Sequence, residues 1–165
     1  WPKVKESVPE ATLDIYYGWD SWVALEGEDD FYQRMTKKLK EMEPLGVKEH
    51  GRVDHKTLAK KFEESKVWAY PTEFPEIHCI TALKANMAGC KPVITDVAAL
   101  KETGGPSASV VETDKIYSDE YSQEVFVEEL ISALKEDHDP KEQINWAKES
   151  DWKNIAKAWG EAIDA

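Results

Sequence analysis

Short apolar segments alternate with longer amphipathic ones along the chain. The short segments are rich in β-branched and aromatic residues, which is typical of strands, and lie at 13–17, 47–53, 67–70, 92–95 and 108–111. Between them, apolar residues recur every three or four positions and predict helices at 31–42, 58–62, 81–87 and 121–134. Strands that alternate with helices predict parallel βαβ units. We therefore expect an α/β fold with a doubly wound parallel sheet and helices on both faces.

Capping residues mark several helix ends and predict a helical C-terminal tail. Asp54 is the expected N-cap of the helix near residue 58, and Gly89 suits the left-handed residue after the helix at 81–87. Asp139 and Pro140 fit the N-cap and first position of the next-to-last helix, and Ser150 can cap the last one. The tail after the final strand is therefore expected to be all helical.

Tryptophans occur in two settings along the sequence. Trp152 and Trp159 share a stripe of the last helix with Ile155 and Ile163, which favours packing in a core or against another domain. Trp19 and Trp22 instead follow Gly18, in a predicted loop at the carboxyl edge of the sheet, where such folds bind ligands. These two could stack on a sugar.

The length of 165 residues, with 41% hydrophobic residues, predicts one domain over 1–165 with a sizeable core. The chain opens at Trp1 in a segment that reads like the interior of an element. We therefore expect a fragment of a longer, two-domain chain.

Acidic residues outnumber basic ones by 33 to 21, which gives a net charge of -12. This charge repels nucleic-acid phosphates and anionic lipids, so neither is an expected partner. Because no apolar run approaches the ~20 residues of a membrane span, we expect no span and no signal peptide. Cys79 and Cys90 are the only cysteines, and they suit reduced thiols in a cytoplasmic protein better than a disulfide framework.

The loop at 71–81 joins the third predicted strand to a helix and combines a carboxylate with a helix N-terminus. Free backbone N–H groups at such an N-terminus bind phosphate well. Glu76 would then accept hydrogen bonds from hydroxyl groups attached to that phosphate, such as those of a sugar. An acidic residue in such a loop more often serves only as a helix cap, and both interpretations stand at this point.

Three segments, at 49–53, 70–76 and 82–95, resemble family 4 retaining glycosyltransferases. The specific feature is the order of a strand, Pro71-Thr72, Glu76, a helix of small residues ending at Gly89, and a strand at 92–95. Residues 8–18 are also similar to that family's second strand region. The resemblance is to the C-terminal, donor-binding half of the GT-B fold. It implies transfer of a sugar from a nucleotide-sugar with retention of configuration, no metal or other cofactor, and a separate N-terminal half without which this domain is inactive.

In the family that the chain resembles, two glutamates eight positions apart frame the donor site. Glu76 matches the first, which faces the transferred sugar, and is the implied catalytic residue. Lys84 stands where the second, which accepts hydrogen bonds from the ribose, is expected. Because a lysine ammonium only donates, three outcomes stay open: Lys84 contacts a donor phosphate, the enzyme is weak, or the site is degenerate.

The resemblance also implies donor-binding roles for backbone groups. Arg52 and Val53 match the loop that holds the nucleobase. The stretch that approaches the diphosphate carries bulkier residues than the family's usual glycines, which makes close approach harder. Its residues are Ile77, His78, Cys79, Ile80 and Thr81. His78 could also contact the donor phosphate or have only a surface role.

Other functions are less well supported by the sequence. A non-catalytic scaffold of the same fold is the main alternative, because Lys84 replaces a motif glutamate; a nucleotide-sugar epimerase of similar fold is a third. Asp14 and Asp96 could be a hydrolase pair, although structural roles are favoured. The histidines and cysteines match no zinc spacing, so no metal site is expected; they are His50, His55, His78, Cys79 and Cys90.

Overall fold

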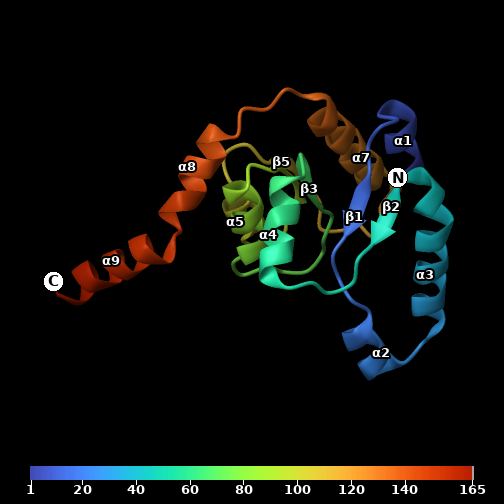
Figure 1. Ribbon diagram of the computed structural model, residues 1–165, viewed down its shortest axis with the longest axis horizontal. Helices are drawn as coiled ribbons and strands as arrows, with labels where there is room; N and C mark the ends of the chain where they lie inside the picture. Colours follow the sequence, from blue (N-terminus) through green and yellow to red (C-terminus); the bar gives the residue numbers. More distant parts are fainter. Residues whose placement is uncertain (165) are drawn as a thin grey trace. The chain divides into compact units, whose positions relative to one another are not determined.

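The computed structural model describes residues 1–164, and the chain divides into two compact units at Leu58 and Ala59. The first unit contains α1 (Pro2–Ser7), β1 (Leu13–Ile15), α2 (Asp20–Glu26), α3 (Asp30–Met42), the 3-10 helix η1 (Glu43–Leu45) and β2 (Val47–Glu49) (Figure 1). Helix α4 (His55–Glu63) contains the boundary. The second unit contains β3 (Val67–Tyr70), α5 (Ile80–Met87), β4 (Lys91–Thr95), α6 (Leu100–Thr103), β5 (Ser109–Val111), α7 (Glu120–Lys135), α8 (Lys141–Glu149) and α9 (Trp152–Ile163).

The strands form two parallel sheets, one in each unit. In the first unit β1 pairs with β2, with Leu13 opposite Val47. In the second unit β4 lies between β3 and β5 and runs parallel to both. Parallel strands connected by helices confirm the α/β fold class. The single domain expected over 1–165 stays a prediction.

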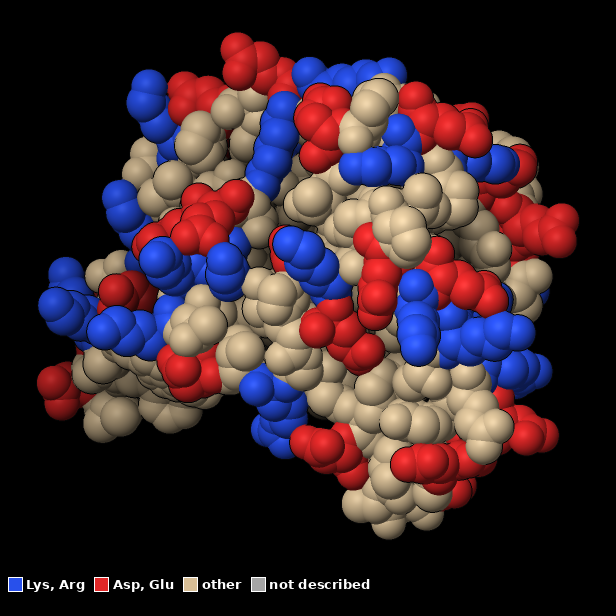
Figure 2. Space-filling model, turned by 45° about the vertical axis from the view of Figure 1, so that its right-hand side comes forward, with Lys and Arg blue, Asp and Glu red and all other residues tan. Residues whose placement is uncertain are grey.

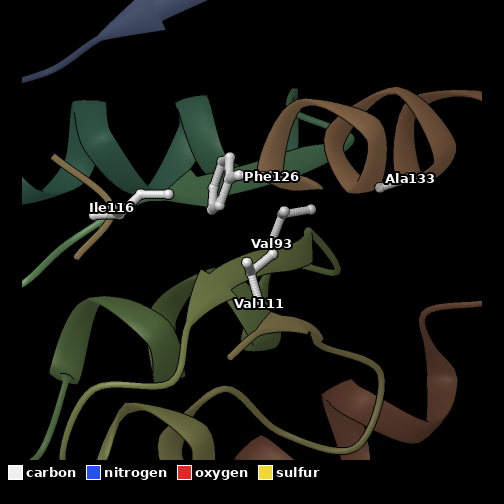
Figure 3. Packing of buried hydrophobic residues seen from close by; sticks show 5 residues of the cluster. All are labelled: Val93, Val111, Ile116, Phe126 and Ala133. Carbon is white, nitrogen blue, oxygen red and sulfur yellow. The ribbon is translucent and has the colours of Figure 1, made fainter. Parts of the chain in front are cut away.

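Helix α7 covers one face of the second unit's sheet. Val93 of β4 and Val111 of β5 point toward Phe126 and Ala133 of this helix, with Ile116 beside them (Figure 3). All five side chains are buried, and burying each large apolar group stabilises the fold by about 1.5–3 kcal/mol.

The opposite face of the same sheet carries α5 and α6. Ile94 of β4 packs there with Ala82 of α5 and Leu100 of α6, and all three are fully buried. Trp68 and Tyr70 of β3 are partly buried and pack against this second cluster. Alternate strand residues therefore face different helices, as expected for a doubly wound sheet.

The first unit has a smaller core, which is built around β2. Val4 of α1 and Val47 of β2 are almost completely buried, at 1% and 2% exposed. Trp1 Nε1 donates a hydrogen bond to the carbonyl of Leu45 (2.9 Å), and Lys5 Nζ donates one to Ala11 (2.8 Å). The first bond joins the N-cap of α1 to η1, which precedes β2, and the second joins α1 to the segment before β1.

Residues 20–26 form helix α2, so the prediction of a loop after Gly18 is wrong. Aromatic packing explains the helix, because Trp19 and Trp22 both contact Phe31 of α3. Trp22 Nε1 also donates a hydrogen bond to Asp29 Oδ1 (3.1 Å), the N-cap of α3. Both tryptophans therefore have a structural role in the first unit.

Most of the predicted helix ends are confirmed, but two caps differ by one residue. Asp54 Oδ1 accepts a hydrogen bond from the Thr57 amide (2.9 Å), and Gly89 has a φ of +87°. The last helix is capped by Asp151 rather than Ser150, because the Asp151 carboxylate accepts from the Lys153 amide (2.9 Å). At α8 the N-cap is Pro140.

The tryptophan face of α9 is exposed, which contradicts core packing for this stripe within the described residues. Trp152 is 82% exposed and Trp159 is 68% exposed. Helix α9 extends away from the sheet of its own unit (Figure 1), and no described element of that unit covers these two rings. The helical spacing was correct, but the expected packing partner is not found among the described residues of the second unit.

Charged groups of both signs cover the surface that Figure 2 displays, with Asp and Glu interspersed among Lys and Arg. In the whole sequence acidic residues outnumber basic ones, and the net charge is -12. Among the helices of residues 1–164, none has both the length and the apolar character needed to cross a bilayer.

Candidate functional site

Glu76 lies in the loop between β3 and α5, where hydrogen bonds from three directions hold it. Its amide donates to the Phe74 carbonyl (2.9 Å), and its own carbonyl accepts from the Ala99 amide (3.0 Å). Its Oε1 accepts from the hydroxyl of Tyr70 at the end of β3 (2.9 Å). The carboxylate is half-buried and fixed at the carboxyl edge of the sheet.

The loop after β4 reaches Glu76 through a rare backbone conformation. Ala98 has a φ of +50°, the left-handed region that non-glycine residues seldom adopt. The next residue, Ala99, donates the amide hydrogen bond to the Glu76 carbonyl. Strain of this kind persists only where surrounding contacts enforce it, and such strain clusters at functional sites.

The Tyr70 phenol and the Cys79 thiol are both harder to ionise than usual. Burial is the main cause of the raised pKa of Tyr70, and the hydrogen bond to Glu76 adds to it, so that the pKa is about 12. Burial likewise raises the pKa of Cys79. At neutral pH Tyr70 is therefore a hydrogen-bond donor, and Cys79 is a neutral thiol.

Helix α5 begins at Ile80, four residues after Glu76, and its N-cap is Cys79. Cys79 is buried at 4% exposed, whereas Ile77 and Ile80 are 91% and 59% exposed. His78 and Thr81 are exposed too. The loop therefore brings the predicted diphosphate-binding stretch together with Glu76. Lys84 lies exposed one turn further along the same helix.

The first unit contains a pocket of about 320 Å³ that includes Arg52 and Val53, the two residues assigned to the nucleobase. This volume lies at the lower end of the range for small-molecule sites. The lining residues combine aromatic rings, a guanidinium, a hydroxyl and apolar groups; they are Tyr16, Tyr17, Gly18, Ser21, Arg52, Val53 and Leu58.

Two local features shape this pocket. Arg52 lies close against Gly18, because a Cβ placed on Gly18 would be 3.0 Å from Arg52 Cγ. The ring of Tyr16 stacks on His50 at 4.6 Å, and His50 Nε2 lies 2.5 Å from Asp14 Oδ1. Asp14 therefore has a structural partner at the strand ends, as favoured from the sequence.

The remaining candidate side chains from the sequence are Asp96, the two cysteines and the possible metal ligands. Asp96 forms an ion pair with Lys101, whose Nζ lies 3.4 Å from Asp96 Oδ2. The cysteines are free and buried, which agrees with reduced thiols. No group of three or more metal-ligating side chains that could hold an ion occurs in residues 1–164.

Sequence reasoning did not identify Tyr70, Ala98 or the tyrosines of the pocket. Tyr70 carried a signal, because it ends a strand directly before Pro71. Ala98 carried none, since a left-handed φ is signalled by glycine or asparagine rather than alanine. Tyr16 and Tyr17 were counted as strand residues, but β1 ends at Ile15 and leaves them in the loop that lines the pocket.

Comparison with solved structures places this architecture among glycosyltransferases. A structure described as the GtfA/B complex matches with a TM-score of 0.71 at 15% identity over 98% of this chain. The fold is one that known glycosyltransferases share. A second match, the pneumococcal O-GlcNAc transferase GtfA in complex with UDP and GlcNAc, has a TM-score of 0.66 at 16% identity, also over 98% of this chain.

These matches are evidence for the fold of this chain and for nothing beyond it. The chain spans 31% of the length of each matched protein. No protein-family model matches the sequence, and no curated protein sequence is similar to it at a significant level.

Proposed function

We propose that this chain is the donor-binding domain of a retaining glycosyltransferase related to family 4, and that it binds a nucleotide-sugar. One observation carries the proposal: the Glu76 carboxylate, which accepts a hydrogen bond from Tyr70, lies just before the N-terminus of α5 at the carboxyl edge of the second unit's sheet. In the first unit, the pocket that Arg52 and Val53 line has aromatic and guanidinium faces, the groups on which nucleobases stack. The shared fold of solved glycosyltransferases supports the same assignment.

We assign the sugar and the diphosphate to the edge of the second sheet. A carboxylate accepts hydrogen bonds from vicinal hydroxyl groups, so Glu76 suits a sugar and would position it for transfer. The amides at the start of α5 suit a diphosphate and would stabilise the negative charge that develops as this leaving group departs. The acceptor would bind to an N-terminal half outside these residues, and catalysis would need both halves.

Lys84 supports a second candidate function, a scaffold or interaction domain that has lost donor binding. A lysine cannot accept the hydrogen bonds that the glutamate expected at this position would accept from a ribose. If this replacement abolishes binding, the fold alone remains, and a fold does not establish activity. The two candidates make opposite predictions for the unmodified protein.

The test is thermal unfolding of the purified protein with UDP, GDP and ADP and with their sugar conjugates. UDP-N-acetylglucosamine belongs in the panel because one matched structure contains UDP and GlcNAc. A ligand at 100 times its Kd stabilises the folded state by about 2.7 kcal/mol, which is readily measured. Glu76→Ala and Lys84→Glu are compared with Glu128→Ala and Lys148→Glu, which alter exposed charges on α7 and α8.

The donor-domain proposal predicts a base-selective shift that Glu76→Ala reduces for the sugar conjugate only. A parent protein that responds to no nucleotide, with binding restored in Lys84→Glu, would favour the scaffold. Absence of any shift in the parent and in both site variants would contradict nucleotide-sugar binding.

A further inference from the structure

Tyr70 joins the sheet to the Glu76 carboxylate. It is the last residue of β3, and its ring stacks on Trp68 of the same strand with centroids 5.2 Å apart. Its hydroxyl donates to Glu76 Oε1 at 2.9 Å. Because the strand and the neighbouring ring hold the phenol, the sheet determines where this donor lies.

The main chain of Glu76 is fixed independently of Tyr70. The carbonyl of Phe74 and the amide of Ala99 bond to its backbone, one from its own loop and one from the loop after β4. These bonds set the position of Cα but leave the side-chain torsions of the glutamate free. Fixing such a side chain costs up to about 2 kcal/mol in rotamer entropy, so a bound ligand gains when the protein has already fixed it.

We propose that Tyr70 is the positioning residue that presents the Glu76 carboxylate to the donor sugar, an inference that rests on the proposed function. Its hydroxyl occupies one acceptor position of the carboxylate. An ionised carboxylate offers about four such positions, so capacity remains for two sugar hydroxyls. Removing the phenolic oxygen should therefore weaken recognition of the sugar and leave recognition of the nucleotide unchanged.

The phenol is suited to this role at every physiological pH. Burial and the bond to Glu76 raise its pKa to about 12, so the hydroxyl stays protonated and donates. A group that ionised near neutrality would repel the carboxylate instead of holding it.

The experiment measures the affinity of the purified protein for UDP-N-acetylglucosamine and for UDP, and for the corresponding GDP and ADP pairs, by titration calorimetry. The variants are Tyr70→Phe, Glu76→Ala and the double variant. Tyr121→Phe is the matched control, because it removes the same oxygen from a tyrosine of α7 that is 74% exposed.

We expect Tyr70→Phe to weaken binding of the sugar conjugate about tenfold and to change binding of the nucleoside diphosphate by less than about twofold. Glu76→Ala should show the same split. Adding Tyr70→Phe to Glu76→Ala should have no further effect, because no carboxylate is left for the phenol to position. The control should match the parent for both ligands.

Three results would overturn the role of Tyr70 and leave the proposed function standing. They are parental affinity of Tyr70→Phe for the sugar conjugate, equally weakened binding of both ligands by Tyr70→Phe, and additive losses of affinity in the double variant. A parent protein that binds none of the nucleotides or conjugates would overturn the proposed function, and this inference with it. If Tyr70→Phe does not fold, Glu76→Asp replaces it, since its shorter side chain withdraws the carboxylate from the phenol. Undiminished affinity of Glu76→Asp for the sugar conjugate would then overturn the inference.

Discussion

Cys90 is a buried thiol that contacts main-chain carbonyls of its own unit. Its Sγ donates to the carbonyl of Phe62 at 3.0 Å and lies 3.3 Å from that of Ser65, and the side chain is 0% exposed. Burial raises the pKa of this thiol to about 11. Since the thiolate is the reactive form, both its low population and its burial protect it.

We therefore predict that Cys90 resists alkylation by iodoacetamide in the native protein and reacts only on unfolding. Cys79, which is also buried, should behave in the same way. Mass spectrometry of labelled peptides, with and without guanidinium chloride, gives the two rates separately. Native labelling of Cys90 as fast as that of the unfolded chain would contradict this environment.

The raised pKa of Tyr70 predicts how alkaline pH affects stability. The folded state binds the phenolic proton more tightly, with a pKa of about 12 against 10.0 for an unperturbed tyrosine. The stabilisation is complete below pH 10 and is lost as the pH rises through the folded pKa. The free energy of unfolding of the parent relative to Tyr70→Phe should therefore decrease above pH 10, as urea denaturation can measure. A constant difference across this window would contradict the prediction.

The sequence allowed some residues of the candidate site to be predicted and not others. Glu76 and Arg52 could be selected because they occupy positions in a recognisable order of strand, loop and helix. Tyr70 could not be assigned a partner, because its bond to Glu76 depends on the path of the loop between them. The left-handed Ala98 was equally hidden, since its conformation follows from contacts and not from its own preference.

Strand β4 and helix α9 represent opposite extremes of packing in this molecule. Ile94 of β4 is 0% exposed and touches both neighbouring helices of its face, whereas Trp159 of α9 is 68% exposed. We predict that Ile94→Ala lowers the free energy of unfolding by about 2–5 kcal/mol, because it leaves a cavity. Trp159→Ala should change it by no more than about 0.5 kcal/mol.

Urea denaturation of both variants provides the comparison. A large loss of stability in Trp159→Ala would show that α9 packs against another surface in solution. A small loss of stability in Ile94→Ala would contradict the tight packing around this side chain of β4.

Several helices and strands lie where the hydrophobic pattern of the sequence predicts them. Helices α3, α5 and α7 and the three strands of the second unit lie where the apolar spacing predicted them. Helix α2 was missed because its stabilising partners, Phe31 and Tyr32, belong to the next helix. The exposed face of α9 could not be predicted, because an amphipathic stripe has the same spacing whether or not a partner covers it.

The net charge of -12 acts on the whole molecule. Repulsion among excess carboxylates destabilises the compact state, and salt screens it. We predict that the melting temperature of the parent rises between low and physiological ionic strength. The increase should be larger for Lys148→Glu, because this substitution adds to the acidic excess. Differential scanning calorimetry over a sodium chloride series tests this, and a melting temperature that falls with salt would contradict it.

The measurement that most directly tests donor binding is titration calorimetry of the parent, Arg52→Ala and Glu76→Ala with UDP-N-acetylglucosamine and with UDP. If Glu76 contacts the sugar, Glu76→Ala weakens binding of the sugar conjugate only. If Arg52 contacts the base, Arg52→Ala weakens binding of both ligands to the same extent. If UDP is the wrong nucleotide, the same split is expected with the GDP or ADP pair. Equal affinities of all three proteins for every pair, or no binding at all, would contradict the account.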